Sequence, residues 1–443
     1  MIGDREPEVV AQFLVDVGQR RRDPHARANR EAEPMGLTGA VVRILAEDDD
    51  AGVRVRGEVQ RGEHLLWWWI HGVGGALGRD ELLQLGPVGL IELIAQQRVP
   101  VGRRHLGPLP SMVVVFDHLE RATLATLPTA LEAGPVLDGG ARLWVKRDDL
   151  TGLGGGGNKA RKLEFLCGEA LAGGARSLVT VGAAQSNHCR MTAAAGARLG
   201  LEVHLVLSGD RPAVATGNQL LSTLFGAQLH FTGADESHWG ELEIARESVT
   251  EQLFAEGLAP YAFPIGGSTA VGALGYAAAF LELLDQLEAA DVRPGHVVFT
   301  SSSGGTHAGL LAGRAAAAHS GRWVPDLVAI GVAKGVNVGH PDIADLANRT
   351  LELMGSTAIV ADEDVEVDTR WMGDDYAVPT PEGDAAVHWG ATHGGWLMDR
   401  TYSGKGLAGL LGLAAEGRFG SDVVFVHTGG WPALFAPDGT PAR

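Results

Sequence analysis

The sequence GGGGNKARKLE at residues 154–164 contains four consecutive glycines followed by an asparagine and a lysine. Glycine lets the backbone approach a ligand closely, and Asn158 is expected to cap a helix whose first turn carries Lys159. The partial positive charge of a helix N-terminus lowers the pKa of an amine, so that more of the amine is neutral and nucleophilic near neutral pH. The stretch therefore predicts that Lys159 is a Schiff-base lysine.

Other interpretations of this stretch are weaker. A glycine loop that ends in lysine can also hold a nucleotide phosphate, but that motif needs the order Gly-Lys-Ser/Thr, and here Asn158 precedes Lys159 and Ala160 follows it. Lys162, one turn further on, is expected to be a solvated helix lysine or the partner of an acid. An amine nucleophile has few alternatives, because the lysines of the chain are Lys146, Lys159, Lys162, Lys334 and Lys405.

A second glycine-rich turn, TSSSGGTHAGL at residues 300–310, follows an apolar run at residues 296–299 and precedes an alanine-rich segment. A strand, a glycine–serine turn and a helix in this order place backbone N–H groups and hydroxyls around a phosphate at the positive end of the helix. The turn is therefore predicted to be a phosphate-binding cup, with an ordinary strand-to-helix connection as the alternative.

A third motif, GAAQSNHCR at residues 182–190, again lies where a strand leads into a helix. Its Ser186, Asn187 and His188 can donate to a carboxylate, bond a phenolic oxygen or relay a proton, although any of them can also serve as a helix cap. A serine hydrolase is disfavoured, because the Gly-x-Ser-x-Gly pattern of a nucleophile elbow does not surround Ser186.

The composition is that of a globular protein. The chain has 443 residues, of which 45% are hydrophobic and 20% charged, and its net charge is −18. The negative charge disfavours nucleic acid or an anionic membrane as a partner, and the arginines at residues 20–22 are expected on a solvated face. Cys167 and Cys189 are expected to be small buried hydrophobic residues. With no signal-peptide pattern, no apolar run of about 18 residues and no metal-ligand pattern, we expect a soluble cytoplasmic protein without a metal site.

From about residue 143 onward, short β-branched runs alternate with longer alanine- and leucine-rich segments. The runs at residues 177–181, 202–207, 228–231, 296–300, 327–332 and 422–426 are predicted to be strands, and the segments at 161–172, 188–199 and 271–287 helices. Such units predict an α/β fold with two doubly wound parallel-sheet domains. Residues 1–110 are predicted to be an N-terminal appendage of unknown role with a short sheet and a linker at 100–110. Its tryptophans at residues 67–69 are expected in a strand packed on the main body, with an aromatic binding surface as the alternative.

The three motifs occur in a fixed order with two further ones. GGNKARKLE, QSNH and SGGTHAGL are followed by TYSGK at residues 401–405 and HTGG at residues 427–430. This set resembles the D-cysteine desulfhydrase and 1-aminocyclopropane-1-carboxylate (ACC) deaminase family of fold-type-II, tryptophan-synthase-β-like enzymes, which use pyridoxal 5′-phosphate (PLP). The resemblance covers residues 119–435 and implies a large PLP-binding domain at 111–162 and 271–443, a small α/β domain at 163–270, and a homodimer.

The resemblance assigns roles to individual positions. Lys159 is implied to bind PLP, Asn187 to bond the phenolic oxygen of PLP, and Ser186 to lie near the carboxylate and Cα of a small amino-acid substrate. The other implied site residues form a phosphate cup, two active-site tyrosines and two hydroxyl positions near the ring nitrogen: Ser303, Gly304, Gly305 and Thr306; Tyr376 and Tyr402; Ser403 and Thr428. The implied catalytic residues are Lys159, Ser186 and the two tyrosines.

Two of these positions separate the subfamilies. ACC deaminases have a glutamate and a leucine where this chain has Ser403 and Thr428, as desulfhydrases do. A carboxylate beside the ring nitrogen keeps the ring protonated and a strong electron sink, whereas a hydroxyl leaves a weaker one. A weaker sink suffices for the loss of a good β leaving group. The resemblance therefore favours the conversion of D-cysteine to pyruvate, ammonia and hydrogen sulfide.

Other activities stay open. A cysteate sulfo-lyase or a lyase for another β-substituted alanine is the nearest alternative, followed by an ACC deaminase and by a PLP-binding module that has lost catalysis. Three positions depart from the family pattern: Ser302 stands where glycine is common, Met191 where glutamine is common and Trp371 where tyrosine is frequent. If Met191 and Trp371 line the pocket, they bear on the identity of the substrate.

Overall fold

The computed structural model describes residues 118–234, 238–333 and 342–437, together with Phe116 and four strands before residue 72. The chain divides into two units, residues 1–107 and residues 108–443, and each has its own fold. The predicted linker at residues 100–110, the arginines at residues 20–22 and Lys334 lie outside the described residues.

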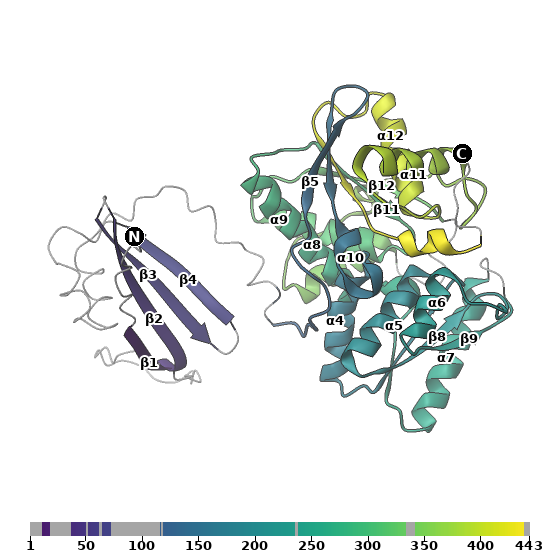
Figure 1. Ribbon diagram of the computed structural model, residues 1–443, viewed down its shortest axis with the longest axis horizontal. Coiled ribbons are helices and arrows are strands. Elements are labelled where there is room, and N and C mark those ends of the chain that lie inside the picture. Colours follow the sequence, from purple (N-terminus) through teal and green to yellow (C-terminus); the bar gives the residue numbers. More distant parts are fainter. Residues whose placement is uncertain are drawn as a thin grey trace, which may run out of the picture. The chain divides into compact units, whose positions relative to one another are not determined.

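The first unit contains an antiparallel sheet in the order β1-β2-β3-β4 (Figure 1). Its strands are β1 Ala11–Val17, β2 Leu37–Asp49, β3 Gly52–Arg61 and β4 His64–His71. The tryptophans at residues 67–69 lie in β4 and pair with residues 56–58 of β3. The predicted strand is confirmed, whereas its packing on the main body stays a prediction.

The second unit contains two sheets (Figure 1). The small sheet is parallel in the order β10-β7-β8-β9, and the large sheet has the order β13-β12-β11-β14-β6-β5, in which β5 alone of the described strands runs antiparallel. The strands are β5 Leu131–Val136, β6 Arg142–Lys146, β7 Ser177–Gly182, β8 Glu202–Leu207, β9 Gln228–Phe231, β10 Pro260–Ala262, β11 His296–Ser301, β12 Asp326–Gly331, β13 Val367–Asp368 and β14 Val423–Val426. This is the two-sheet α/β architecture that the sequence predicts.

Helices cover both faces of each sheet. In the small sheet, α4 and α5 pack on one face and α7 on the other. In the large sheet, α8, α9 and α10 cover one face, and α11 and α12 cover the other. The helices are α4 Lys159–Ala172, α5 Asn187–Leu199, α6 Gly217–Leu224, α7 Trp239–Ala255, α8 Ala270–Ala289, α9 Gly305–His319, α10 Ile343–Leu353, α11 Pro381–Gly394 and α12 Ser403–Ala415.

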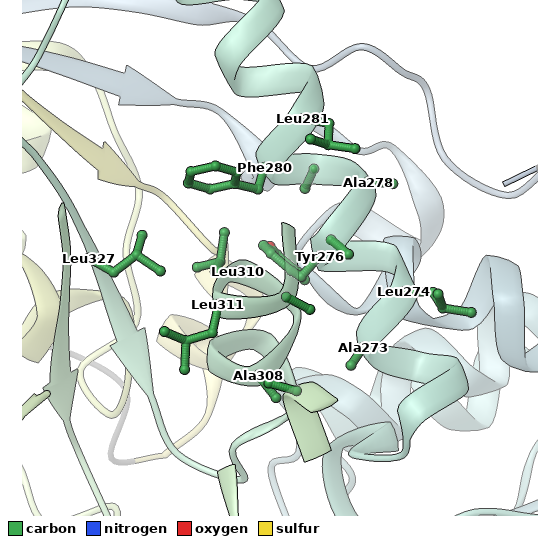
Figure 2. Close-up of a cluster of buried hydrophobic side chains, with 14 of the residues drawn as sticks. Ala273, Leu274, Tyr276, Ala278, Phe280, Leu281, Ala308, Leu310, Leu311 and Leu327 are labelled. Carbon is green, nitrogen blue, oxygen red and sulfur yellow. The ribbon is translucent and has the colours of Figure 1, made fainter. Parts of the chain in front are cut away.

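Side chains along the central strands alternate between the two faces of the large sheet. In β11, Val297 and Phe299 join the core under α8 to α10, and Val298 joins the core under α11 and α12. Figure 2 shows the first of these cores, where side chains of α8 and α9 gather beside Leu327 of β12. Helix α8 is long and apolar enough to cross a membrane, but 78% of its most apolar window is buried inside the protein, so it is a core helix.

The predicted strands and helices match the observed ones to within one or two residues at each end, and β8 and β9 have the predicted bounds. Strands β5, β6, β10 and β13 were not predicted. β5 contains Gly134 and Pro135, β10 begins with Pro260, and β13 spans two residues. Proline and glycine weaken a strand pattern and are tolerated at sheet edges, which is where β5, β10 and β13 lie.

A buried cluster of charges joins α4 to α8 and to the turn after β6. Arg161 donates to Asp148 through Nε (2.8 Å) and Nη2 (2.9 Å), and to Glu282 through Nη1 (3.0 Å) and Nη2 (2.8 Å). Lys146 also pairs with Glu282, so two cations face two carboxylates. Burial alone would raise the pKa of each carboxyl group, but Arg161 lowers both. The stabilisation is therefore present above the ordinary carboxyl pKa of about 4 and is lost as the pH falls through the lowered values of the folded state.

Replacing Arg161 with leucine is expected to lower the free energy of unfolding by about 3–5 kcal/mol, because Asp148 and Glu282 stay buried without their main cation. Denaturant and thermal unfolding measure the loss. Arg349→Leu is the matched control, since Arg349 pairs with Asp345 at the exposed surface of α10 and its loss should cost no more than about 0.5 kcal/mol. Equal losses in the two variants would contradict the role of the buried cluster.

Candidate active site

A cavity with about 770 Å³ of space, its open mouth included, lies where the carboxyl ends of the two sheets meet. All three sequence motifs contribute to its lining, although they are far apart along the chain. The predicted residues that line it are Lys159, Ser186, Asn187, Ser303, Gly304, Thr306, Tyr376, Tyr402 and Thr428.

Lys159 is the first residue of α4, as the sequence predicts, and its side chain lines the cavity. Its Nζ lies 3.2 Å from Oδ1 of Asn158. Burial lowers the pKa of Lys159 to about 8, while Asp399 opposes this fall and Arg190 adds to it. Burial is the largest cause of this fall, whereas the sequence suggested the partial charge of the helix N-terminus. About half of the amine is therefore uncharged near pH 8, which suits a nucleophile or a base.

Close contacts fix the glycine run that precedes Lys159. Gly156 has a φ of +80°, and a Cβ atom there would lie 1.8 Å from the carbonyl oxygen of Asp149. The hydroxyl of Thr151 accepts from N of Gly157 at 2.9 Å and donates to O of Gly157 at 2.8 Å. The loop is thus tied to the preceding turn and presents Lys159 at a fixed place.

The predicted helix cap at Asn158 is wrong. Asn158 has helical dihedral angles, and its side chain makes no capping hydrogen bond. Its Nδ2 donates instead to Oγ1 of Thr306 at 3.2 Å, 148 residues further along the chain. The side chain therefore joins the lysine loop to the second motif.

The turn before α9 has the form of an anion-binding cup. Gly304 is the N-cap residue, with a φ of +85° and no side-chain capping bond. N of Gly305 donates to Oγ of Ser268 at 3.2 Å, and the hydroxyls of Ser268 and Ser303 are 2.8 Å apart. A Cβ atom on Gly305 would lie 2.6 Å from Nζ of Lys162. Hydroxyls, an amine and the positive end of a 15-residue helix thus converge at one point.

Lys162 is not the solvated helix lysine that the sequence predicts. Its side chain is fully buried, and its Nζ donates to O of Gly266 at 3.0 Å. Burial and the charge of Lys159 hold its pKa well below the ordinary value, and no carboxylate among the described residues offsets this effect. The sequence spacing could have predicted this burial. Residues three apart lie on one side of a helix, so Lys162 lies on the same side of α4 as Lys159 and faces the cup.

Ser186 and Asn187 lie at the start of α5. Oγ of Ser186 accepts from N of Cys189 at 3.1 Å, so Ser186 caps the helix and keeps its hydroxyl proton to donate. Oδ1 of Asn187 accepts from Nη1 of Arg190 at 3.1 Å and from Nδ2 of Asn218 at 3.0 Å. Ser186 is therefore both a helix cap and a cavity residue.

Tyr376 and Tyr402 meet in the cavity, where their hydroxyl groups are hydrogen-bonded to each other. The ring of Trp239 packs edge-on against Tyr376, with 5.4 Å between the ring centroids. The structure thus brings the two predicted tyrosines together as a pair, and it adds an aromatic wall that the sequence did not indicate.

The two predicted hydroxyl positions differ in their surroundings. Thr428 lines the cavity, whereas Ser403 does not. Ser403 is fully buried at the start of α12, and its hydroxyl donates to O of Gly429 at 2.8 Å. Ser403 therefore lies outside the lining of the cavity, whereas the resemblance implies a place near the ring nitrogen of PLP.

Asp399 is a cavity residue that the sequence analysis missed. Its Oδ1 accepts from N of Thr401 at 2.8 Å and from N of Tyr402 at 2.5 Å, and its Oδ2 accepts from the hydroxyl of Ser403 at 3.2 Å. Burial raises the pKa of Asp399, and these hydrogen bonds oppose the rise. An aspartate just before a helix is a common capping residue, so its position gave no sign that its side chain also faces the cavity.

Of the three departures from the family pattern, only Ser302 lines the cavity. Met191 is buried in the core of α4, α5 and the small sheet, and Trp371 packs on the core of α11 and α12. These two substitutions therefore bear on packing. Cys167 and Cys189 are buried as predicted, and burial raises the pKa of each thiol to about 12.

A family model described as "Pyridoxal-phosphate dependent enzyme" matches residues 122–429. The chain belongs to this family of PLP-dependent enzymes. The matched range contains every predicted site residue from Lys159 to Thr428 and none of the first unit.

Individual relatives identify the part of the PLP-dependent family to which this chain is most similar among those compared. A D-cysteine desulfhydrase of Salmonella typhi is 38% identical over 327 residues, which cover 71% of this chain and 95% of that protein. A Pyrococcus abyssi protein named provisionally as an ACC deaminase is 38% identical over 328 residues, which cover 74% and 96%. The crystal structure of an ACC deaminase homologue matches with a TM-score of 0.66 and 34% identity, covering 74% of this chain and 96% of that one. The resemblance to this group is confirmed, and the equal identities leave the substrate undecided.

The cavity residues fit PLP, the cofactor of these enzymes. PLP carries a phosphate, an aldehyde and a phenolic oxygen. The cavity offers a cup with the buried amine of Lys162 for an anion, the amine of Lys159 for an aldehyde, and the amide of Asn187 as a hydrogen-bond donor. The donor set thus matches the three reactive groups of the cofactor.

With the cofactor removed, Lys159 is expected to react with a small amine-directed reagent at a rate that is half-maximal near pH 8, because only the uncharged amine reacts. Labelling of the full chain across neutral and alkaline pH, followed by peptide mass spectrometry, measures this midpoint. The denatured chain is the control, in which the same lysine should titrate near its ordinary pKa of about 10.4. Equal midpoints in the native and denatured chains would contradict the effect of burial.

Proposed function

We propose that this PLP-dependent enzyme removes a β substituent from a small amino acid, with D-cysteine as its substrate and pyruvate, ammonia and hydrogen sulfide as its products. One observation carries the proposal. An amine with a pKa of about 8 lies in the same cavity as an anion-binding cup at the start of α9. This pairing supports a cofactor that is held by its phosphate and attached through its aldehyde.

The residues around the cavity would hold PLP at three points. Lys159 would bind it covalently, and Nδ2 of Asn187 would donate to its phenolic oxygen. Thr428 would lie near the ring. The phosphate would be bound by Lys162 and by the cup residues Ser303, Gly304, Gly305 and Thr306.

When bound, PLP supplies an electron sink that stabilises negative charge at the Cα atom of the substrate. The amine of Lys159 would accept the Cα proton. Ser186 can donate its free hydroxyl proton to the substrate carboxylate, because its oxygen already accepts from the backbone. Tyr376 and Tyr402 share a hydrogen bond and can pass a proton to the sulfur as it leaves.

The choice of β-elimination over cyclopropane opening rests on the absence of a glutamate at position 403. Ser403, which does not line the cavity, has a hydroxyl whose single proton is shared between O of Gly429 and Oδ2 of Asp399. A site of this kind supports modest stabilisation of charge at Cα, which suits a substrate with a good leaving group.

Other substrates are compatible with the same chemistry. Cysteate or another β-substituted alanine would use the same residues, and the relative named as an ACC deaminase keeps that activity as a further candidate. A PLP-binding module without catalysis is the remaining alternative. The proposal includes a cytoplasmic homodimer, which gel filtration with light scattering would test for its oligomeric state.

Lys159→Ala is the direct test of the covalent role. The variant should lose the visible absorption band of the bound cofactor and lower kcat by roughly 100- to 10,000-fold, since one amine serves both for attachment and as the base. Lys162→Met is the contrast, one turn along the same helix: it should keep the band and release PLP more readily. Normal turnover and an unchanged band in Lys159→Ala would refute the assignment.

Substrate choice is tested by a panel of D-cysteine, L-cysteine, β-chloro-D-alanine, cysteate and ACC. Release of pyruvate, 2-oxobutyrate and sulfide identifies the reaction, and D-cysteine should give pyruvate and sulfide at the highest kcat/KM. Formation of 2-oxobutyrate from ACC at the best rate would favour the deaminase instead. Inactivity toward the whole panel, with PLP bound, would favour the binding module.

A further inference from the structure

Arg190, on α5, is a buried guanidinium that forms no ion pair with a carboxylate among the described residues. Its side chain is fully buried, and its Nε has no hydrogen-bond partner. Burial lowers the pKa of Arg190 to about 10, with Asp399 opposing the fall, so the group stays charged at neutral pH. Burying a charge without a counter-ion costs free energy, so a role for Arg190 in the site would account for its presence.

The contacts of Arg190 join two motifs of the site. Its Nη2 donates to O of Gly156 in the glycine loop at 2.7 Å. Its Nη1 donates to Oδ1 of Asn187 at 3.1 Å and to Oδ1 of Asn218 at 2.8 Å. Gly156 lies three residues before Lys159, and Asn187 lines the cavity. One side chain therefore ties the loop that carries the amine to the helix that carries the amide.

These contacts determine which way the two amides point. A guanidinium has donors only, so Oδ1 of Asn187 and Oδ1 of Asn218 must both face it. Nδ2 of Asn218 then donates to O of Gln185 at 2.7 Å and to Oδ1 of Asn187 at 3.0 Å. With two donors on Oδ1 of Asn187, its Nδ2 is the atom left for a ligand in the cavity.

We infer that Arg190 is a positioning residue, which turns Nδ2 of Asn187 toward the phenolic oxygen of PLP and holds the glycine loop so that Lys159 faces the aldehyde. The charge of Arg190 also favours the uncharged form of Lys159 and an anionic phenolic oxygen. The inference rests on the proposed contacts of Lys159 and Asn187 with the cofactor.

Charged and titratable groups approach Lys159 from several elements. They are Lys162 on α4, His188 and Arg190 on α5, His307 on α9, Asp399 and Tyr402 before α12, and Tyr376 before α11. Substitutions at Arg190 remove none of these other groups. A shift in the titration of Lys159 that appears in Arg190→Gln and not in Arg190→Lys therefore reports the charge at position 190.

Arg190→Gln and Arg190→Lys separate the charge from the geometry. In the full chain with PLP removed, Arg190→Gln should raise the labelling midpoint of Lys159 by roughly one pH unit, and Arg190→Lys should keep the wild-type midpoint. Both should raise the Kd for PLP roughly tenfold when each is combined with Lys159→Ala, because neither side chain reaches Gly156 and both amides at once. The Lys159→Ala background removes any contribution of the covalent bond.

Arg198→Gln is the matched control. Arg198 lies on the same helix and donates to O of Leu124 at 3.0 Å, so its replacement should move neither the midpoint nor the Kd. If Arg190→Gln lowers only the thermal stability and leaves both readouts unchanged, Arg190 is structural and the inference is overturned.

Asn218→Leu is a second variant for the case that Arg190→Gln does not fold. It removes one donor to Asn187 and keeps the charge of Arg190. It should therefore raise the Kd for PLP without moving the midpoint of Lys159, and an unchanged Kd overturns the inference.

Different results would refute the proposed function and the role of Arg190. If the wild-type chain binds no PLP, the proposed function fails, whereas wild-type behaviour of the variants in a chain that binds PLP through Lys159 removes only the role of Arg190.

Discussion

The ion pairs of Arg161 with Asp148 and Glu282 fix the helix on which the site depends. Helix α4 begins with three cationic side chains in four residues. With 3.6 residues per turn, Lys159 and Lys162 lie on one side of the helix and Arg161 lies on the opposite side. Both carboxylates approach from the side of Arg161, one from the turn after β6 and one from α8. The same turn therefore anchors the helix on one side, and on the other it presents Lys159 to the cavity and Lys162 to the turn before α9.

The sequence predicted the parts of the site that are local. A glycine run before a lysine and a glycine–serine turn after a strand are short patterns whose geometry follows from the backbone itself. Features that depend on residues far away in the sequence were either missed or predicted wrongly. Asn158 does not cap α4 because Thr306 binds its side chain, and Lys162 is buried because the cup closes over it. No pattern near Asp399 reveals which neighbours surround it once the chain folds.

Strands covered on both faces were mostly predicted, with two exceptions to the trend: the half-buried edge strand β9 was predicted, and β6 was missed although it lies inside the large sheet. Strands such as β8 and β11 are covered on both faces, so they read as continuous apolar runs. Strands β5, β10 and β13 form the edges of their sheets and depend on neighbours rather than on their own residues. The sheet interiors place the cup and the start of α5 at their carboxyl ends, so the strands that matter for the site are the ones that the sequence predicts well.

Basic side chains gather at the cavity of a chain whose net charge is −18. Lys159 lines the cavity, and Lys162 and Arg190 donate from behind its wall to the lining residues Gly266 and Asn187. Burial and the charge of Lys159 hold the pKa of Lys162 well below its ordinary value. A phosphate in the cup would raise the pKa of Lys162, because an opposite charge favours the protonated amine. Binding of an anionic cofactor should thus favour the protonated form of Lys162, which in turn holds the phosphate more strongly.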